Sequence, residues 1–237
     1  QGKSNSNKDN KTDLIIKHAD IRKSLLNMKS IIEGQRSLAF WLSQQIDVSL
    51  NHYNVDIRKD AEDLVSLLTP VVKSFFSDMG MEITNDAIQV FGGYGYTKDQ
   101  GIEQFYRDNR ITPIYEGTNS VQAIDLVFRK VLNKKILDKY LDLINQEIKV
   151  SLKNTQLKKS AEYLNLTLIE LKKFTDWLIK KDKTNKDDVS AACNDFLKVL
   201  GYISLGFSWL KISRISIEKT KENKEFYEEK LNTANYY

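Results

Sequence analysis

Apolar residues recur every three or four positions along most of this 237-residue chain. This period places them on one face of an α-helix, whereas the alternating apolar and polar runs typical of strands are few. The first long run follows Asp20, which can cap a helix start. Its apolar members form a stripe that we expect to face the core, namely Ile21, Leu25, Met28, Ile32, Ala39, Leu42 and Ile46. The pattern predicts an all-α fold with a long first helix.

Three further helices are expected in the first half of the chain. One follows a polar break after the first helix. The next is predicted to begin at the pair Thr69-Pro70, because threonine caps helix starts and proline suits the first helical position, and to end at Gly92. The last runs from Thr118 to Leu132. Together these segments predict an up-down four-helix bundle over residues 14–132.

Residues 133–237 are predicted to form a helical C-terminal extension. One run repeats in steps of four and three, as helices do when they pack along a seam: Leu157, Ala161, Leu164, Leu168, Leu171, Thr175 and Leu178. A later helix is expected to be buried in the core of the extension through Phe196, Val199, Tyr202, Ile203, Phe207 and Leu210. The extension has 20 Lys and Arg against 15 Asp and Glu, but the signs are interleaved. Solvated helix faces are therefore favoured over a nucleic-acid surface.

Composition narrows the function classes. The single cysteine, Cys193, excludes a disulfide framework, and with His18 and His52 as the only histidines no Cys/His cluster has metal-ligand spacing. No apolar run is long enough to span a membrane and no signal peptide is visible, so a cytoplasmic protein is expected. Residues 1–13 are polar and of low complexity, which predicts a disordered or linker start and a segment of a longer polypeptide.

Six of the ten glycines lie between Gly80 and Gly117, so close approach to the backbone is concentrated there. Within this stretch Glu116 follows a Pro-Ile-Tyr run and precedes a glycine. This position is unusual, because in so charged a chain most acidic residues are expected on solvent-exposed helix faces. Two interpretations fit. The carboxylate is favoured by the positive end of the helix that begins at Thr118, or it is a catalytic base in apolar surroundings.

Two motifs in this stretch are QVFGGYGYT, at Gln89–Thr97, and YRDNRITPIYEGTN, at Tyr106–Asn119. In order, spacing and residue type, they and the following helix resemble the C-terminal α-domain of the acyl-CoA dehydrogenases over about Leu14 to Leu132. The long region after this domain is most similar to the subgroup that includes 3-methylmercaptopropionyl-CoA dehydrogenase. The resemblance implies FAD-dependent α,β-dehydrogenation of an acyl-CoA thioester, such as 3-methylmercaptopropionyl-CoA or a related short or medium acyl-CoA.

The resemblance also implies roles for individual residues. Glu116 is the expected base that removes the α-proton while FAD takes the β-hydride. The substrate is expected at Tyr115, Glu116 and Gly117. The FAD of a neighbouring subunit is expected to contact Gln89, Val90, Phe91, Gly92 and Gly93. FAD phosphate or ribityl groups are expected near Thr118, Asn119 and Ser120. Implied partners are electron-transfer flavoprotein or another electron acceptor, and further copies of the chain in a dimer or tetramer.

A second function class stays open. A helical assembly or interaction module, or a nucleic-acid-associating relative, could keep the same motif without turning over substrate. Members of the family enclose flavin and acyl chain with an N-terminal helical domain and a β-domain, and we find no counterpart of either in these 237 residues. We therefore expect the isolated chain to hold FAD poorly and to be inactive by itself.

Overall fold

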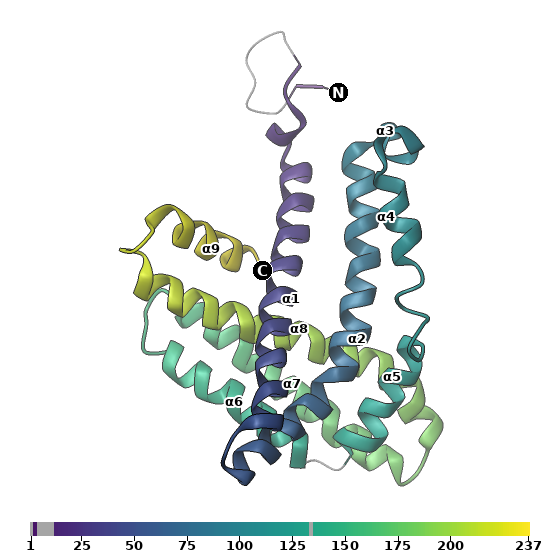
Figure 1. Ribbon diagram of the computed structural model, residues 1–237, viewed down its shortest axis with the longest axis vertical. Coiled ribbons are helices and arrows are strands. Elements are labelled where there is room, and N and C mark those ends of the chain that lie inside the picture. Colours follow the sequence, from purple (N-terminus) through teal and green to yellow (C-terminus); the bar gives the residue numbers. More distant parts are fainter. Residues whose placement is uncertain (1, 4–11, 133–134) are drawn as a thin grey trace.

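The computed structural model describes residues 2–3, 12–132 and 135–237. All regular structure within these ranges is helical, so the all-α prediction is confirmed (Figure 1). The predicted linker start at 1–13 lies largely outside the described residues. Two short 3₁₀ helices and one π-helix are η1 (Ile15–Lys17), η2 (Lys98–Gln100) and η3 (Leu126–Val131). The α-helices are α1 (Ala19–Asn51), α2 (Val55–Phe91), α3 (Gly93–Tyr96), α4 (Ile102–Asn109), α5 (Asn119–Asp125), α6 (Lys135–Ser151), α7 (Lys158–Asp182), α8 (Lys186–Lys219) and α9 (Lys224–Tyr236).

Helix α8 joins the extension to the bundle. It lies against α1, α2 and α5 as well as α7 and α9, and Figure 1 shows it crossing α1 and α2. One hydrophobic cluster runs through both halves of the chain, from Leu38 and Phe75 in the bundle to Leu168 and Phe196 in the extension. The extension therefore packs on its own bundle around a common core. No helix in the described ranges is both long and apolar enough to cross a membrane.

Helix α2 continues through Pro70, so the predicted helix start at Thr69 is wrong. A proline inside a helix has no N–H to donate to the carbonyl four residues earlier, here that of Ser66. Lys130 in η3 supplies a substitute, because its Nζ donates to the Ser66 carbonyl (2.7 Å) and to Ser66 Oγ (2.9 Å). A side chain from the end of the bundle thus satisfies the carbonyl that Pro70 leaves free, and one long helix results.

The first predicted helix exists as α1, but the stripe expected to face the core is largely wrong. The buried residues of α1 are Ser30, Ile31, Gly34, Leu38 and Leu42. Three members of the predicted stripe, Leu25, Ile32 and Ile46, are each more than a third exposed to solvent. The cause is Trp209 of α8, whose indole nitrogen lies 2.8 Å from the place of a Cβ at Gly34 and donates to the Ser30 carbonyl (3.0 Å). Where α1 and α8 cross, the small residues Ser30 and Gly34 therefore lie on the buried face of α1.

In the extension the predicted seam is confirmed. The residues Leu157, Ala161, Leu164, Leu168, Leu171, Thr175 and Leu178 are all buried. The expectation for the later helix, α8, is right for Phe196, Ile203, Phe207 and Leu210. It is wrong for Val199 and Tyr202, which are each 38% exposed. Tyr202 packs edge-to-face on Phe75 of α2, with ring centroids 4.9 Å apart, and so lies at the rim of the core.

Candidate active site

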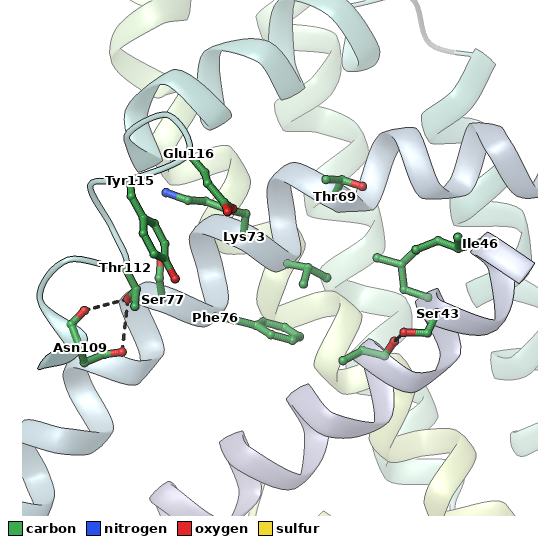
Figure 2. A pocket seen from close by; sticks show the side chains of 13 residues that line it. Ser43, Ile46, Thr69, Lys73, Phe76, Ser77, Asn109, Thr112, Tyr115 and Glu116 are labelled. Carbon is green, nitrogen blue, oxygen red and sulfur yellow. Dashed lines mark hydrogen bonds between the residues drawn. The ribbon is translucent and has the colours of Figure 1, made fainter. Parts of the chain in front are cut away.

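A groove of about 570 Å³ opens between α1, α2 and the loop that joins α4 to α5 (Figure 2). Helices α1 and α2 provide an apolar wall that includes Ala39, Leu42, Ile46, Val72 and Phe76. Three of these belong to the stripe of α1 that the sequence placed in the core. The loop side is more polar and contains Asn109, Thr112, Tyr115 and Glu116. The groove thus places one carboxylate beside an apolar surface.

Glu116 lies on a backbone turn of unusual conformation. It is the one residue other than glycine with a positive φ in the described ranges, at 55°, and Gly117 follows with a φ of 81°. A left-handed backbone is unfavourable for a residue with a Cβ, persists only where the surrounding structure imposes it, and clusters at functional sites. Gln122 in α5 donates through Nε2 to the Glu116 carbonyl (2.9 Å). The turn therefore fixes the point from which the carboxylate projects.

Asn119 ties this turn to α2. Its Nδ2 donates to Asp78 Oδ1 (2.7 Å) and Ser77 Oγ (2.9 Å), and its Oδ1 accepts from Lys73 Nζ (2.9 Å). The same ammonium group of Lys73 donates to the Gly117 carbonyl (2.7 Å). The loop is thus held against the half of α2 that lines the groove, and Figure 2 shows Lys73 beside Tyr115 and Glu116.

The residues on either side of Asn119 also contact protein groups. Thr118 caps α5 and accepts a hydrogen bond from the Val121 amide (3.4 Å). Ser120 Oγ accepts one from Asn194 Nδ2 of α8 (3.3 Å), which links the extension to the site. The structure therefore brings Thr118, Asn119 and Ser120 together with Tyr115–Gly117, in one compact turn. Their contact with FAD stays a prediction.

The carboxylate of Glu116 is open to solvent in this chain. Glu116 is an exposed residue, and its neighbours Ile114 and Tyr115 are 45% and 49% exposed. The apolar surroundings expected for a base are therefore present on the groove side only.

The glycine loop Gln89–Gly93 lies apart from this turn. It occupies the far end of α2, at the tip of the arm that α2, α3 and α4 form in Figure 1. Lys73, which holds the turn, precedes Gln89 by sixteen residues of continuous helix, a length of about 24 Å. A Cβ placed on Gly92 or Gly93 would meet no atom within 4 Å, so the backbone there is accessible. The structure does not bring the two groups of predicted FAD contacts together.

Two residues that shape the site were not singled out from the sequence. Lys73 comes 44 positions before the Gly117 carbonyl it binds, and helical periodicity gives no signal for such a contact. Gln122 lies six positions after Glu116, on the first turns of α5, where spacing could have indicated it. In the described part of the chain, no group of three or more His, Cys, Asp or Glu residues could hold a metal ion.

Known families match both halves of the chain. The family described as "Acyl-CoA dehydrogenase, C-terminal domain" matches residues 4–131, and "Acetyl-CoA dehydrogenase C-terminal like" matches residues 140–237. A 3-methylmercaptopropionyl-CoA dehydrogenase from Ruegeria pomeroyi is 42% identical over 118 residues, which make up 50% of this chain and 20% of that protein. The broad-specificity linear acyl-CoA dehydrogenase FadE5 from Mycobacterium tuberculosis is 28% identical over 240 residues, which cover 94% of this chain and 39% of that protein.

Solved structures share the fold. Caenorhabditis elegans ACDH-11, in complex with C11-CoA, superposes with a TM-score of 0.72 at 22% identity, covering 90% of this chain and 34% of that one. Acyl-CoA oxidase 3 from Yarrowia lipolytica gives a TM-score of 0.67 at 13% identity, covering 99% of this chain and 37% of that one.

The fold is a helical domain in which long helices flank an apolar groove and one acid is held on a constrained turn beside it. The first family match covers more than half of the residues, and the chain belongs to the acyl-CoA dehydrogenase family. It spans between a fifth and two fifths of the length of the two curated relatives named above.

Proposed function

We propose that this chain is the C-terminal part of a flavin-dependent acyl-CoA dehydrogenase in which Glu116 removes the α-proton of an acyl-CoA thioester. The observation that carries the proposal is the position of Glu116. It lies in the matched family motif, on a positive-φ turn, and at the edge of an apolar groove. A capping acid at a helix start needs neither the constrained turn nor the groove. The combination therefore favours a base over a structural carboxylate.

The groove suits the apolar part of an acyl chain. Two of its polar side chains, Ser43 and Thr69, donate their hydroxyl hydrogens to carbonyls of their own helices, at 2.9 and 2.7 Å. These bonds leave an α1–α2 surface dominated by aliphatic and aromatic groups. An acyl chain on this surface would bring its α-carbon towards the loop that carries Glu116. Tyr115 and Gly117 flank the base and are the proposed substrate neighbours.

FAD, when bound, would accept the β-hydrogen as a hydride. Thr118, Asn119 and Ser120 lie beside the proposed base and are the residues of this chain proposed to face that flavin. Gln89–Gly93 lies about 24 Å along α2 from Lys73 and exposes its glycine backbone. We therefore assign Gln89, Val90, Phe91, Gly92 and Gly93 to the FAD of a second copy. This assignment implies a dimer or tetramer, and an electron acceptor such as electron-transfer flavoprotein would reoxidise the flavin.

Two relatives are named for the acyl-CoA substrates on which they act. One is named for 3-methylmercaptopropionyl-CoA and another for broad specificity on linear acyl-CoA. We propose a short or medium linear acyl-CoA for this chain. The second candidate, a helical assembly module that keeps the motif without turnover, is favoured by one observation only: the described residues leave Glu116 exposed.

The test compares the 237-residue chain with the natural polypeptide that contains it. We expect the polypeptide to retain FAD through gel filtration, measured by flavin absorbance, and the chain alone to lose it. The polypeptide should also dehydrogenate members of an acyl-CoA panel of increasing length, followed with an artificial electron acceptor. A polypeptide that holds FAD but oxidises no acyl-CoA would support the assembly module instead.

A further inference from the structure

We propose that Lys73 and Gln122 are positioning residues that clamp the turn of Glu116 and so hold its carboxylate in place. The inference rests on the proposed function, because these residues are proposed to orient the carboxylate of the base Glu116. Neither residue is assigned contact with substrate or flavin. They act through the backbone of the turn.

Both carbonyl groups of the constrained turn are held by side chains. The carbonyl of Glu116 accepts from Gln122 Nε2 (2.9 Å), and that of Gly117 accepts from Lys73 Nζ (2.7 Å). The two donors come from different helices, α5 and α2. A left-handed residue with a Cβ reverts to an ordinary conformation unless its surroundings hold it there. These two hydrogen bonds hold the carbonyls of Glu116 and Gly117, which are the two residues of the turn with a positive φ.

Lys73 also links the turn to the groove. It projects from α2 one residue after Val72 and one turn before Phe76 and Ser77, all of which line the groove. Its ammonium group binds Asn119 Oδ1 (2.9 Å) as well as the Gly117 carbonyl. Charge-assisted hydrogen bonds are about twice as strong as neutral ones. A half-buried lysine on a long helix therefore sets the distance between the base and the wall on which the acyl chain would lie.

The expected consequence is kinetic rather than thermodynamic. Lys73 lines the groove, but the apolar wall that would bind the acyl chain is formed by other residues, so affinity should change little when the ammonium group is removed. Proton abstraction depends on the placement of the carboxylate, and a misplacement of about 1 Å can cost about 10²-fold in rate. Loss of the clamp should therefore lower the rate of flavin reduction by about 10- to 100-fold.

The test uses Lys73→Met in the FAD-loaded natural polypeptide. Flavin reduction by acyl-CoA is followed by rapid mixing, and binding of the enoyl-CoA product is measured at equilibrium. We expect the reduction rate to fall by about 10- to 100-fold while the enoyl-CoA dissociation constant stays within about threefold. Lys139→Met is the matched control, since Lys139 also makes two hydrogen bonds to α2, with Asp60 (2.7 Å) and Asp63 (2.6 Å), but lies outside the groove.

Rescue separates positioning from a general loss of structure. Lys73→Cys treated with 2-bromoethylamine regains an ammonium group at nearly the length of lysine, and it should recover most of the lost rate. The native thiol Cys193 does not interfere, because it is buried and burial raises its pKa to about 11. Treated wild-type protein controls for cysteines elsewhere in the polypeptide. Failure of the ammonium group to restore the rate would overturn the proposal.

A readout independent of activity is available in the 237-residue chain. Amide hydrogen exchange in a peptide covering 112–122 should speed up in Lys73→Met and in Gln122→Met, because the Asn119 amide is bonded across the loop to the Pro113 carbonyl (3.1 Å). Unchanged exchange and an unchanged reduction rate in both variants would refute the clamp. Glu116→Gln run in parallel keeps the two ideas apart. If it abolishes reduction while Lys73→Met does not, the proposed function stands and the clamp falls; if it leaves reduction intact, the proposed function falls.

Discussion

Replacement of Lys130 by Met should destabilise the chain well beyond the effect expected of a surface lysine. Lys130 is 17% exposed, and its Nζ makes the two bonds to Ser66 that compensate for the missing N–H of Pro70. A hydrogen bond to a charged group contributes about 1.5–3 kcal/mol, and an unsatisfied buried carbonyl costs about 1–3 kcal/mol. Because Ser66 is half-buried, we expect the free energy of unfolding to fall by about 2 kcal/mol.

Urea unfolding of the 237-residue chain, followed by circular dichroism, measures this loss. Arg129→Met is the matched control, because Arg129 is 79% exposed and its pair with Asp125 (2.9 Å) lies on the helix surface, where such pairs contribute about 0.3–0.5 kcal/mol. The decisive variant is Pro70→Ala combined with Lys130→Met. An alanine at position 70 restores an N–H for the Ser66 carbonyl, so the double variant should lose about 1 kcal/mol less than the sum of the single variants. Strict additivity would refute the compensation.

Three further outcomes are expected. Gly201→Ala should destabilise the chain by about 1–3 kcal/mol in urea unfolding, since the added Cβ would lie 2.4 Å from the ring of Phe75, whereas Gly93→Ala adds a methyl group to open space and should be nearly neutral. Cys193 should stay unreactive towards a thiol reagent at pH 8 in the folded chain and react in urea, because burial raises its pKa to about 11 and keeps the thiol protonated; reaction at equal rates in both states would contradict this. Arg214→Met should lower the free energy of unfolding by about 3–5 kcal/mol, because it leaves the buried carboxylate of Glu147 without a partner. In the wild type two guanidinium nitrogens of Arg214 donate to the two oxygens of this carboxylate, at 2.7 and 3.1 Å. A loss below about 1 kcal/mol would contradict this account.

The sequence predicts helices well wherever large apolar residues alone decide burial. The seam of α7 is an example, because every predicted member is buried. The face of α1 could not be predicted in this way. Close approach of Trp209 to Gly34 buries a side of the helix that contains small residues, and that contact depends on a partner 175 positions away. Ile31 and Leu38 are buried on this side, whereas Leu25, Ile32 and Ile46 of the predicted stripe stay more than a third exposed.

The helix start predicted at Thr69-Pro70 is wrong for a related reason. Proline suits the first position of a helix because inside a helix it leaves a carbonyl without its usual donor, and here Lys130 supplies that donor from a distant element. In the candidate site, local motif and spacing lead to Glu116 and Gly117, whose turn the structure shows. The two side chains that hold the turn are harder to find. Gln122 is local, but Lys73 is recognisable only once α2 and the loop are placed side by side.

The central claim is that Glu116 is the base, and a single-turnover comparison tests it most directly. Glu116→Gln keeps the size of the side chain and the backbone of the turn but cannot take up the α-proton at neutral pH. In the FAD-loaded natural polypeptide, anaerobic mixing with an acyl-CoA substrate should bleach the flavin at least about 10²–10⁴-fold more slowly in this variant, while enoyl-CoA binding is nearly unchanged. Bleaching at close to the wild-type rate would show that the base lies elsewhere and that Glu116 merely precedes a helix.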